Sequence, residues 1–186
     1  MNQIIGIGII ALIIVAIISV FIRIYNTIVL FKFNVEKAYA NIDVLLKQRA
    51  EEIPNLVTTV KEYVSHEKSL LNELTELRTK YFSANTQEEK VTLNNQMAST
   101  LGKIMVVAEN YPALKANTSF VALQERISQL EDNISDRREF FNESVNMYNI
   151  GINEFPNMLL SKSMGYKEKS LLQISDAEKK YDGVKF

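Results

Sequence analysis

The sequence predicts an all-α protein in which an N-terminal transmembrane helix is followed by an antiparallel helical bundle. Three observations lead to this prediction: residues 4–22 form an unbroken apolar run, the chain has three prolines, and no glycine lies between Gly8 and Gly102. Proteins of this size built from β-strands need frequent turn residues, which are sparse here. The bundle is expected to contain three long helices and a short fourth in up-and-down order.

The first element is the apolar run IIGIGIIALIIVAIISVFI at residues 4–22, which meets its first charge at Arg23. A helix of this length is roughly 28 Å long, close to the thickness of the hydrocarbon core of a bilayer. A cleaved secretory signal would have a basic start, a shorter apolar stretch and a small-residue cleavage site, none of which is seen. Because the chain has no cysteine, a lipoprotein anchor is excluded. We expect residues 1–24 to anchor the chain in the lipid bilayer, with a buried core helix as the alternative.

Charge asymmetry around this run predicts its orientation. No basic side chain precedes the run, whereas five follow it: Arg23, Lys32, Lys37, Lys47 and Arg49. Basic residues near the end of a span are retained on the cytoplasmic side. We therefore expect a single-pass protein of the cell membrane, with its N-terminus outside and its body in the cytoplasm.

A long helix is predicted to continue from the anchor into the body. Helical spacing is kept by Ala38, Ile42, Leu45, Leu46, Arg49 and Ile53, and then by Leu56, Val60, Tyr63, Glu67, Leu70, Leu74, Leu77 and Tyr81. Pro54 should kink or end the helix, because it removes one donor and clashes with the preceding turn. The first reversal of the chain is expected near residues 83–85.

The second and third helices have their own start and stop signals. Residues 86–89, Thr-Gln-Glu-Glu, have the form of a capping box, and residues 110–112, Asn-Tyr-Pro, should stop the helix that follows. Asn117 or Thr118 can cap the third helix, which should end near residues 151–156. The apolar stripes are Leu93, Met97, Leu101, Ile104 and Ala108 on the second helix, and Phe120, Leu123, Ile127, Leu130, Ile134, Phe141, Val145 and Tyr148 on the third.

Helices with such stripes and short loops are expected to stack antiparallel and bury the stripes, giving one bundle domain over residues 25–165. A short amphipathic helix around residues 158–160 is expected to close the bundle, although it could instead lie against the lipid surface. Residues 166–186 are mostly polar and are predicted to be a loosely held tail.

Composition and motifs exclude several function classes. The chain has 21 basic and 22 acidic residues, and this net charge of −1 gives no field that would attract nucleic acid. His66 and Glu67 are half of a zinc motif, but position 70 is Leu and there is no second histidine. Paired acidic residues such as Glu51 and Glu52 are adjacent on a helix and diverge. We predict no catalytic, cofactor-binding or metal-binding residues, and no enzymatic activity.

Polar residues on the apolar faces are the candidates for a structural or interaction role. They are Asn41, Asp43, Arg49, His66, Glu67 and Arg137. A polar group on an apolar seam needs a charge or a hydrogen bond from a neighbouring helix, so Arg137 or Arg138 is the expected partner of Asp43 or Glu67. We favour a role in setting the register between helices, and a docking surface is the alternative.

Several ordered motifs resemble the LemA family over essentially the whole chain. They include residues 40–49 (ANIDVLLKQR), 53–57 (IPNLV), 108–117 (AENYPALKAN), 141–142 (FN), 148–149 (YN) and 155–156 (FP). The resemblance implies a bacterial single-pass membrane protein with a mostly four-helix antiparallel bundle and no settled enzymatic activity. Tyr39, Leu77 and the pair Leu171-Leu172 depart from the common family pattern and affect local packing only.

Two function classes follow from these observations. In the first, the bundle is an interaction or scaffolding module that binds a protein partner or self-associates at the membrane. In the second, the chain is a regulatory or accessory subunit of a membrane enzyme such as a protease. The absence of a nucleophile with a base, a metal cluster or a phosphate loop from the sequence favours the first class.

Overall fold

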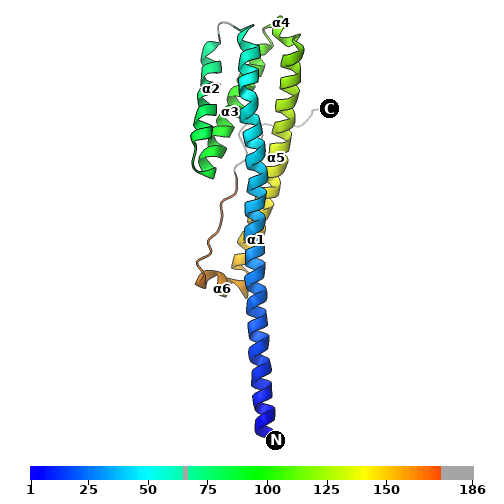
Figure 1. Cartoon of the computed structure of the whole chain (residues 1–186), viewed down its shortest axis with the longest axis vertical. Helices are drawn as coiled ribbons and strands as arrows, with labels where there is room; N and C mark the ends of the chain where they lie inside the picture. The colour runs from blue at the N-terminus through cyan, green and yellow to red at the C-terminus, as the bar shows by residue number, and fades with distance from the viewer. Residues whose placement is uncertain (65–66, 173–186) are drawn as a thin grey trace, which may run out of the picture. The chain divides into compact units, whose positions relative to one another are not determined.

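The computed structural model describes residues 1–64 and 67–172, and every regular element within them is a helix (Figure 1). The helices are α1 (Asn2–Lys61), α2 (Lys68–Ser83), α3 (Gln87–Ala108), α4 (Pro112–Lys115), α5 (Thr118–Asn153) and α6 (Asn157–Ser163). The predicted all-α class is confirmed. The candidate residue His66 lies outside the described residues.

The described chain forms two compact units. The first unit contains Met1–Ala40 and Glu139–Leu172, and the described part of the second unit is Asn41–Arg138. Helices α1 and α5 each contribute residues to both units. The predicted domain boundaries after residues 24 and 165 remain predictions.

Helix α1 is continuous over its 60 residues, and the 18-residue window of its N-terminal apolar part is wholly unburied. Among the described residues, this is the one helix that is long and apolar enough to cross a membrane, judged by length and composition. Because that window contributes nothing to a core, the alternative of a buried core helix does not hold. Pro54 lies inside α1, so the expectation that it could end the helix is wrong.

A chain reversal between α1 and α2 was not predicted from the sequence. The apolar spacing predicted one helix from Leu56 to Tyr81, but α1 ends at Lys61 and α2 begins at Lys68. Residues 62–67 contain no glycine or proline, so no turn signal marks the break. The buried positions of α2 include Leu71, whereas the expected Leu70 is half-buried.

The start signals of α3 and α5 are confirmed. The Thr86 hydroxyl accepts a hydrogen bond from the Glu89 amide at 3.2 Å, and the Glu89 carboxylate accepts one from the Asn85 amide at 3.3 Å. Asn117 caps α5, because its side-chain oxygen accepts from the Phe120 amide at 3.0 Å. The bonds to the Glu89 and Phe120 amides satisfy donors that the first turn of a helix leaves unpaired. The Glu89 carboxylate binds the residue before the cap, and not the Thr86 amide as in the usual capping box.

The core of each unit contains most of the predicted apolar stripes, together with residues outside them such as Ile28 and Val35. In the second unit, where α2 and α3 lie side by side (Figure 1), buried side chains include Ile42, Leu46, Leu56, Leu74, Met97, Leu101 and Ile134. In the first unit, they include Ile28, Val35, Phe141, Val145 and Tyr148. Tyr39 and Phe141 pack edge to face with ring centroids 6.1 Å apart. Gly151 leaves room for the ring of Phe31 beside α5.

Candidate functional site

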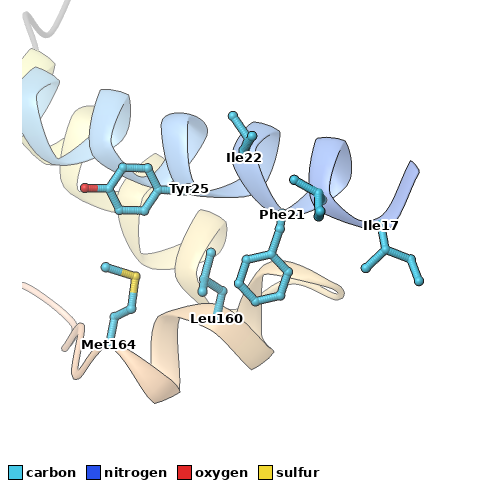
Figure 2. Close-up of a pocket in the computed structure, with 7 residues that line it drawn as sticks. Ile17, Phe21, Ile22, Tyr25, Leu160 and Met164 are labelled. Carbon is cyan, nitrogen blue, oxygen red and sulfur yellow. The ribbon is translucent and has the colours of Figure 1, made fainter. Parts of the chain in front are cut away.

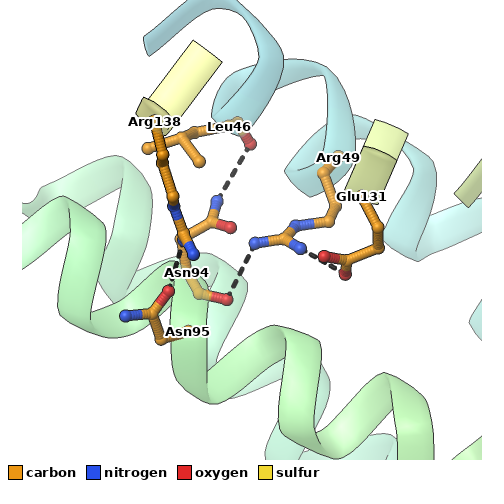
Figure 3. A network of polar contacts seen from close by, with 6 residues as sticks. All are labelled: Leu46, Arg49, Asn94, Asn95, Glu131 and Arg138. Atoms are coloured by element: carbon orange, nitrogen blue, oxygen red, sulfur yellow. Dashed lines mark hydrogen bonds and ion pairs between the residues drawn. The ribbon is translucent and has the colours of Figure 1, made fainter. Parts of the chain in front are cut away.

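A network of polar side chains links α1, α3 and α5 in the second unit (Figure 3); Arg49, Asn94 and Arg138 are buried in it, whereas the Glu131 side chain is about one-third exposed. Arg49 of α1 is only 1% exposed. Its guanidinium donates to the Glu131 carboxylate of α5 and, at 3.1 Å, to the backbone oxygen of Asn94 on α3. Arg49 of α1 is therefore bonded to both α3 and α5, as expected of a residue that sets the register between helices.

Two further side chains extend this network. The buried Asn94 amide donates to the backbone oxygen of Leu46 on α1 at 3.2 Å. Arg138 of α5 is also buried and donates to the Asn95 side-chain oxygen on α3. Since a buried polar group without a hydrogen bond is costly, these contacts favour one relative placement of α1, α3 and α5.

Two ion pairs lie beside the network and are more accessible to solvent. Asp43 of α1 pairs with Lys90 of α3 at 3.3 Å, and both side chains are about one-third exposed. Glu52 of α1 pairs with Arg126 of α5 at 2.6 Å. We expected an arginine of the third helix as the partner of Asp43, and this expectation is corrected to Lys90.

The other sequence candidates lie apart from the network. Asn41 and Arg137 are exposed, and Glu67 is half-buried at the position before α2. The buried arginine of α5 is Arg138, because it continues the helical steps from Ile134 to Phe141, whereas Arg137 points elsewhere.

The network residues Asn94 and Glu131 were missed in the sequence, whereas Arg138 was named there as a possible partner of Asp43 or Glu67 and instead contacts Asn95. A signal was present for Arg138, because it lies four residues after Ile134 and three residues before Phe141, which are both buried. For Asn94 the signal was weaker, because it lies next to Leu93 and three residues before Met97, where an exposed asparagine would fit equally well. Among the described residues, no group of three or more His, Cys, Asp or Glu side chains could hold a metal ion. The hydrogen bonds that Arg49, Asn94 and Arg138 make to neighbouring helices give the network the chemistry of an interhelical link.

A second polar arrangement, here called the asparagine clamp, lies in the first unit and consists of Asn142 and Asn149 of α5. The Asn149 amide donates to the Lys169 backbone oxygen at 2.9 Å, and its oxygen accepts from the Lys169 amide at 2.9 Å. Asn142 makes the same two bonds with Leu172, at 3.0 and 2.8 Å. Each side-chain amide thus satisfies both backbone groups of one residue in the segment after α6.

The spacing of the asparagine clamp matches the geometry of the two chains. Seven residues of helix rise about 10.5 Å, and three residues of extended chain cover about 10 Å. Asn142 and Asn149 can therefore bind Leu172 and Lys169 at the same time without stretching either chain. The expectation of a loosely held tail is wrong for residues 166–172, while residues 173–186 lie outside the described residues. The signal in the sequence was the repeated pair of an aromatic residue followed by asparagine.

Tyr148 adds a third contact beside the clamp. Its hydroxyl donates to the Lys167 backbone oxygen at 3.0 Å. Burial, with a smaller contribution from Tyr166, raises the pKa of Tyr148 above its ordinary value. The phenol therefore stays protonated and able to donate this bond at neutral pH.

Comparison with known proteins gives the class to which this helical chain belongs. Its described residues combine one exposed apolar helix segment with buried polar links between helices. The LemA family model matches residues 38–186, and the chain belongs to the LemA family.

Curated relatives include three magnetosome proteins. Magnetosome proteins MamQ 1 and MamQ 2 of Paramagnetospirillum magneticum are each 23% identical over 186 residues, covering 86% of this chain and 68% of the relative. Magnetosome protein MamQ of Magnetospirillum gryphiswaldense is 30% identical over 69 residues, covering 37% of this chain and 25% of that relative.

Proposed function

We propose that this LemA-family protein is an interaction or scaffolding module held at the membrane by residues 4–22. The observation that carries the proposal is the apolar surface that the first unit leaves uncovered. Apolar side chains throughout residues 4–22 are more than half exposed, which in water would be very unfavourable and in a bilayer is favourable.

The proposed location is the cell membrane, with the N-terminus outside and the body in the cytoplasm. The five basic residues that follow the apolar segment support this orientation. We further propose that α1, α2, α3 and α5 form an antiparallel bundle in the second unit. The links that Arg49 makes to α3 and α5 support this arrangement.

The surface proposed for a partner is a second apolar stripe on α5. Phe140, Met147 and Ile150 are about half exposed and share one face of the helix, away from the buried stripe of Phe141 and Tyr148. A groove of about 230 Å³ lies beside this stripe, with Phe140 and Met147 in its lining. Exposed apolar stripes of this kind suit the packing of a partner helix.

A second copy of the chain is the proposed occupant of this stripe. The groove is lined by Lys37 of α1 and Glu143 of α5, so its charges can pair with those of an identical surface turned by two-fold symmetry. Copies anchored in one membrane would also present this surface at the same height. The alternative is that the stripe binds a membrane enzyme, such as a protease, of which this protein is an accessory subunit.

Site-specific photocrosslinking in membranes tests the proposal. A photoreactive phenylalanine analogue at Met147 should give a product of twice the chain mass, whereas the same analogue at Gln129, an exposed position on α5 in the second unit, should not. A product of another mass that contains a membrane enzyme would favour the accessory-subunit alternative. Equal products from both positions, or none from Met147, would contradict the proposed surface.

A further inference from the structure

A second groove of the first unit lies between α1 and α6 and has a wholly apolar lining (Figure 2). Its volume is about 470 Å³, within the range of about 300 to 1,000 Å³ that is usual for small-molecule sites. The lining includes Ile17, Phe21, Ile22 and Tyr25 of α1, Leu160 of α6, and Met164, which directly follows α6. The α1 side of the groove is therefore formed by the last part of the apolar segment 4–22 and by Tyr25, in the next turn of the same helix.

Helix α6 is fixed next to this segment by hydrogen bonds to the end of α5. The buried Asn157 amide donates to the Gly151 backbone oxygen at 3.0 Å, and the buried Ser161 hydroxyl donates to the Ile152 backbone oxygen. These bonds orient the short helix, so that Leu160 is buried and Leu159 is directed outward. Leu159 is 63% exposed and Met164 is 46% exposed.

Basic residues close in sequence to the groove lining suit the surface of a bilayer. Arg23 follows Ile22, and Lys162 lies between Leu160 and Met164; both side chains are exposed. Helix α6 itself contains no acidic residue, and the Glu154 carboxylate near its start accepts a hydrogen bond from Asn157. Basic side chains at this level can contact lipid phosphates while their stems lie on apolar surface. Tyr25 lines the groove at the end of the apolar segment, and tyrosine is enriched where hydrocarbon meets water.

We infer that the groove between α1 and α6 binds a lipid acyl chain, and that α6 lies in the membrane interface with Leu159 and Met164 directed toward lipid. The sequence left two roles open for this helix, closure of the bundle and contact with lipid, and the exposure of these two side chains favours the second. The inference rests on the proposed function, because it needs residues 4–22 to span the bilayer.

Tryptophan quenching by brominated lipids tests the inference with the full chain in vesicles of phosphatidylcholine and phosphatidylglycerol. The chain has no tryptophan, so each variant carries one reporter. Phe21→Trp reports on the span, and Met164→Trp and Leu159→Trp report on the groove and on α6. Phe33→Trp is the matched control, because this exposed position lies on α1 roughly 16 Å beyond Ile22.

The inference predicts that bromine near the headgroup end of the acyl chain removes about half or more of the emission at positions 21, 159 and 164, and little at position 33. Quenching at position 21 without quenching at 159 and 164 would overturn the inference and leave the anchor intact. Quenching at 159 but not at 164 would overturn the acyl chain as occupant of the groove. No quenching at position 21 would overturn the proposed anchor, and the inference with it.

Discussion

The two units use different polar chemistry along the same helix, α5. In the second unit, its buried contacts are charged: Glu131 receives a bond from Arg49, and Arg138 donates to Asn95. In the first unit, the contacts are neutral: Asn142 and Asn149 each exchange two hydrogen bonds with a backbone. The partners differ in the same way, since the charged groups meet helices and the asparagines meet an extended segment.

This difference follows from which backbone groups are available. A helix interior has already paired its N–H groups, so a neighbouring element finds only side chains and the second lone pair of a carbonyl. Arg49 uses both kinds of acceptor. An extended segment offers an unpaired N–H and C=O on each residue, and a side-chain amide has one donor group and one acceptor to match them. The charged network therefore links helices to one another. The asparagine clamp instead binds a segment whose backbone groups are not paired within a helix.

Breaking the charged link should have the largest effect. Glu131→Ala leaves the guanidinium of Arg49 buried without its carboxylate, and we expect a loss of about 3 kcal/mol in the free energy of unfolding. Urea melts of the full chain in detergent micelles measure this loss. Arg49→Met is the control, because an apolar side chain of similar length removes the buried charge and should cost only about 1 kcal/mol. A larger loss for Arg49→Met than for Glu131→Ala would contradict the role of the carboxylate.

Removing one half of the clamp should have an intermediate and local effect. Asn149→Ala removes two hydrogen bonds and should cost about 1 to 3 kcal/mol locally. Hydrogen exchange should show faster exchange of the Lys169 amide, while amides of α3 near Asn94 keep their protection. Asn153→Ala is the matched control, since its side chain on the same helix donates to the Glu168 carboxylate and makes no exchange with a backbone amide of the segment. Equal loss of protection in both units would show that the clamp is not local.

The exposed ion pair should contribute least at neutral pH. Asp43→Ala removes a contact between side chains that are about one-third exposed, so we expect a loss below about 1 kcal/mol. A double-mutant cycle with Lys90→Ala isolates the interaction between the two residues. A coupling free energy above about 2 kcal/mol would mean that Asp43 belongs with the buried network.

At alkaline pH, the raised pKa of Tyr148 predicts a loss of stability on the clamp side of the comparison. The raised pKa of Tyr148 means that the folded state holds the phenol proton more tightly than the unfolded chain does. Its contribution to stability is complete below the unfolded pKa of about 10 and is lost as the pH rises through the folded value. Melts between neutral and alkaline pH should lose less stability for Tyr148→Phe than for the unchanged chain. The same alkaline loss in both chains would assign it to other groups.

Much of the fold could be predicted because helix starts and apolar stripes are local signals. Thr86 was identified as a cap, and Asn117 was one of two candidates for the next. The apolar members of the buried face of α3 from Leu93 to Ala108 were identified, whereas its polar members Asn94 and Thr100 were not. The break after Lys61 was missed because residues 62–67 contain no glycine or proline to signal it. Spacing along one helix also does not show which neighbouring helix supplies the partner of a charged residue. The sequence therefore could not indicate that Asp43 pairs with Lys90 of α3 and not with an arginine of α5.

The polar sites were harder to predict for the same reason. Burial of Arg49 depends on contacts with α3 and α5 that lie 45 and 82 residues away in the sequence. The clamp could have been suspected, because Asn142 and Asn149 are one heptad apart and each follows a buried aromatic residue. Their partners could not, since the backbone groups of Lys169 and Leu172 carry no sequence signal.

The central claim, that residues 4–22 lie in the bilayer, is tested most directly by nitroxide accessibility along α1. The chain has no cysteine, so a single label can be placed in turn at Ile10, Ile14, Ile17, Leu30 and Phe33 of the full chain in vesicles. We predict that the first three labels collide with oxygen and are shielded from a water-soluble nickel reagent, and that the last two show the reverse. Nickel accessibility as high at Ile10, Ile14 and Ile17 as at Phe33 would contradict the account.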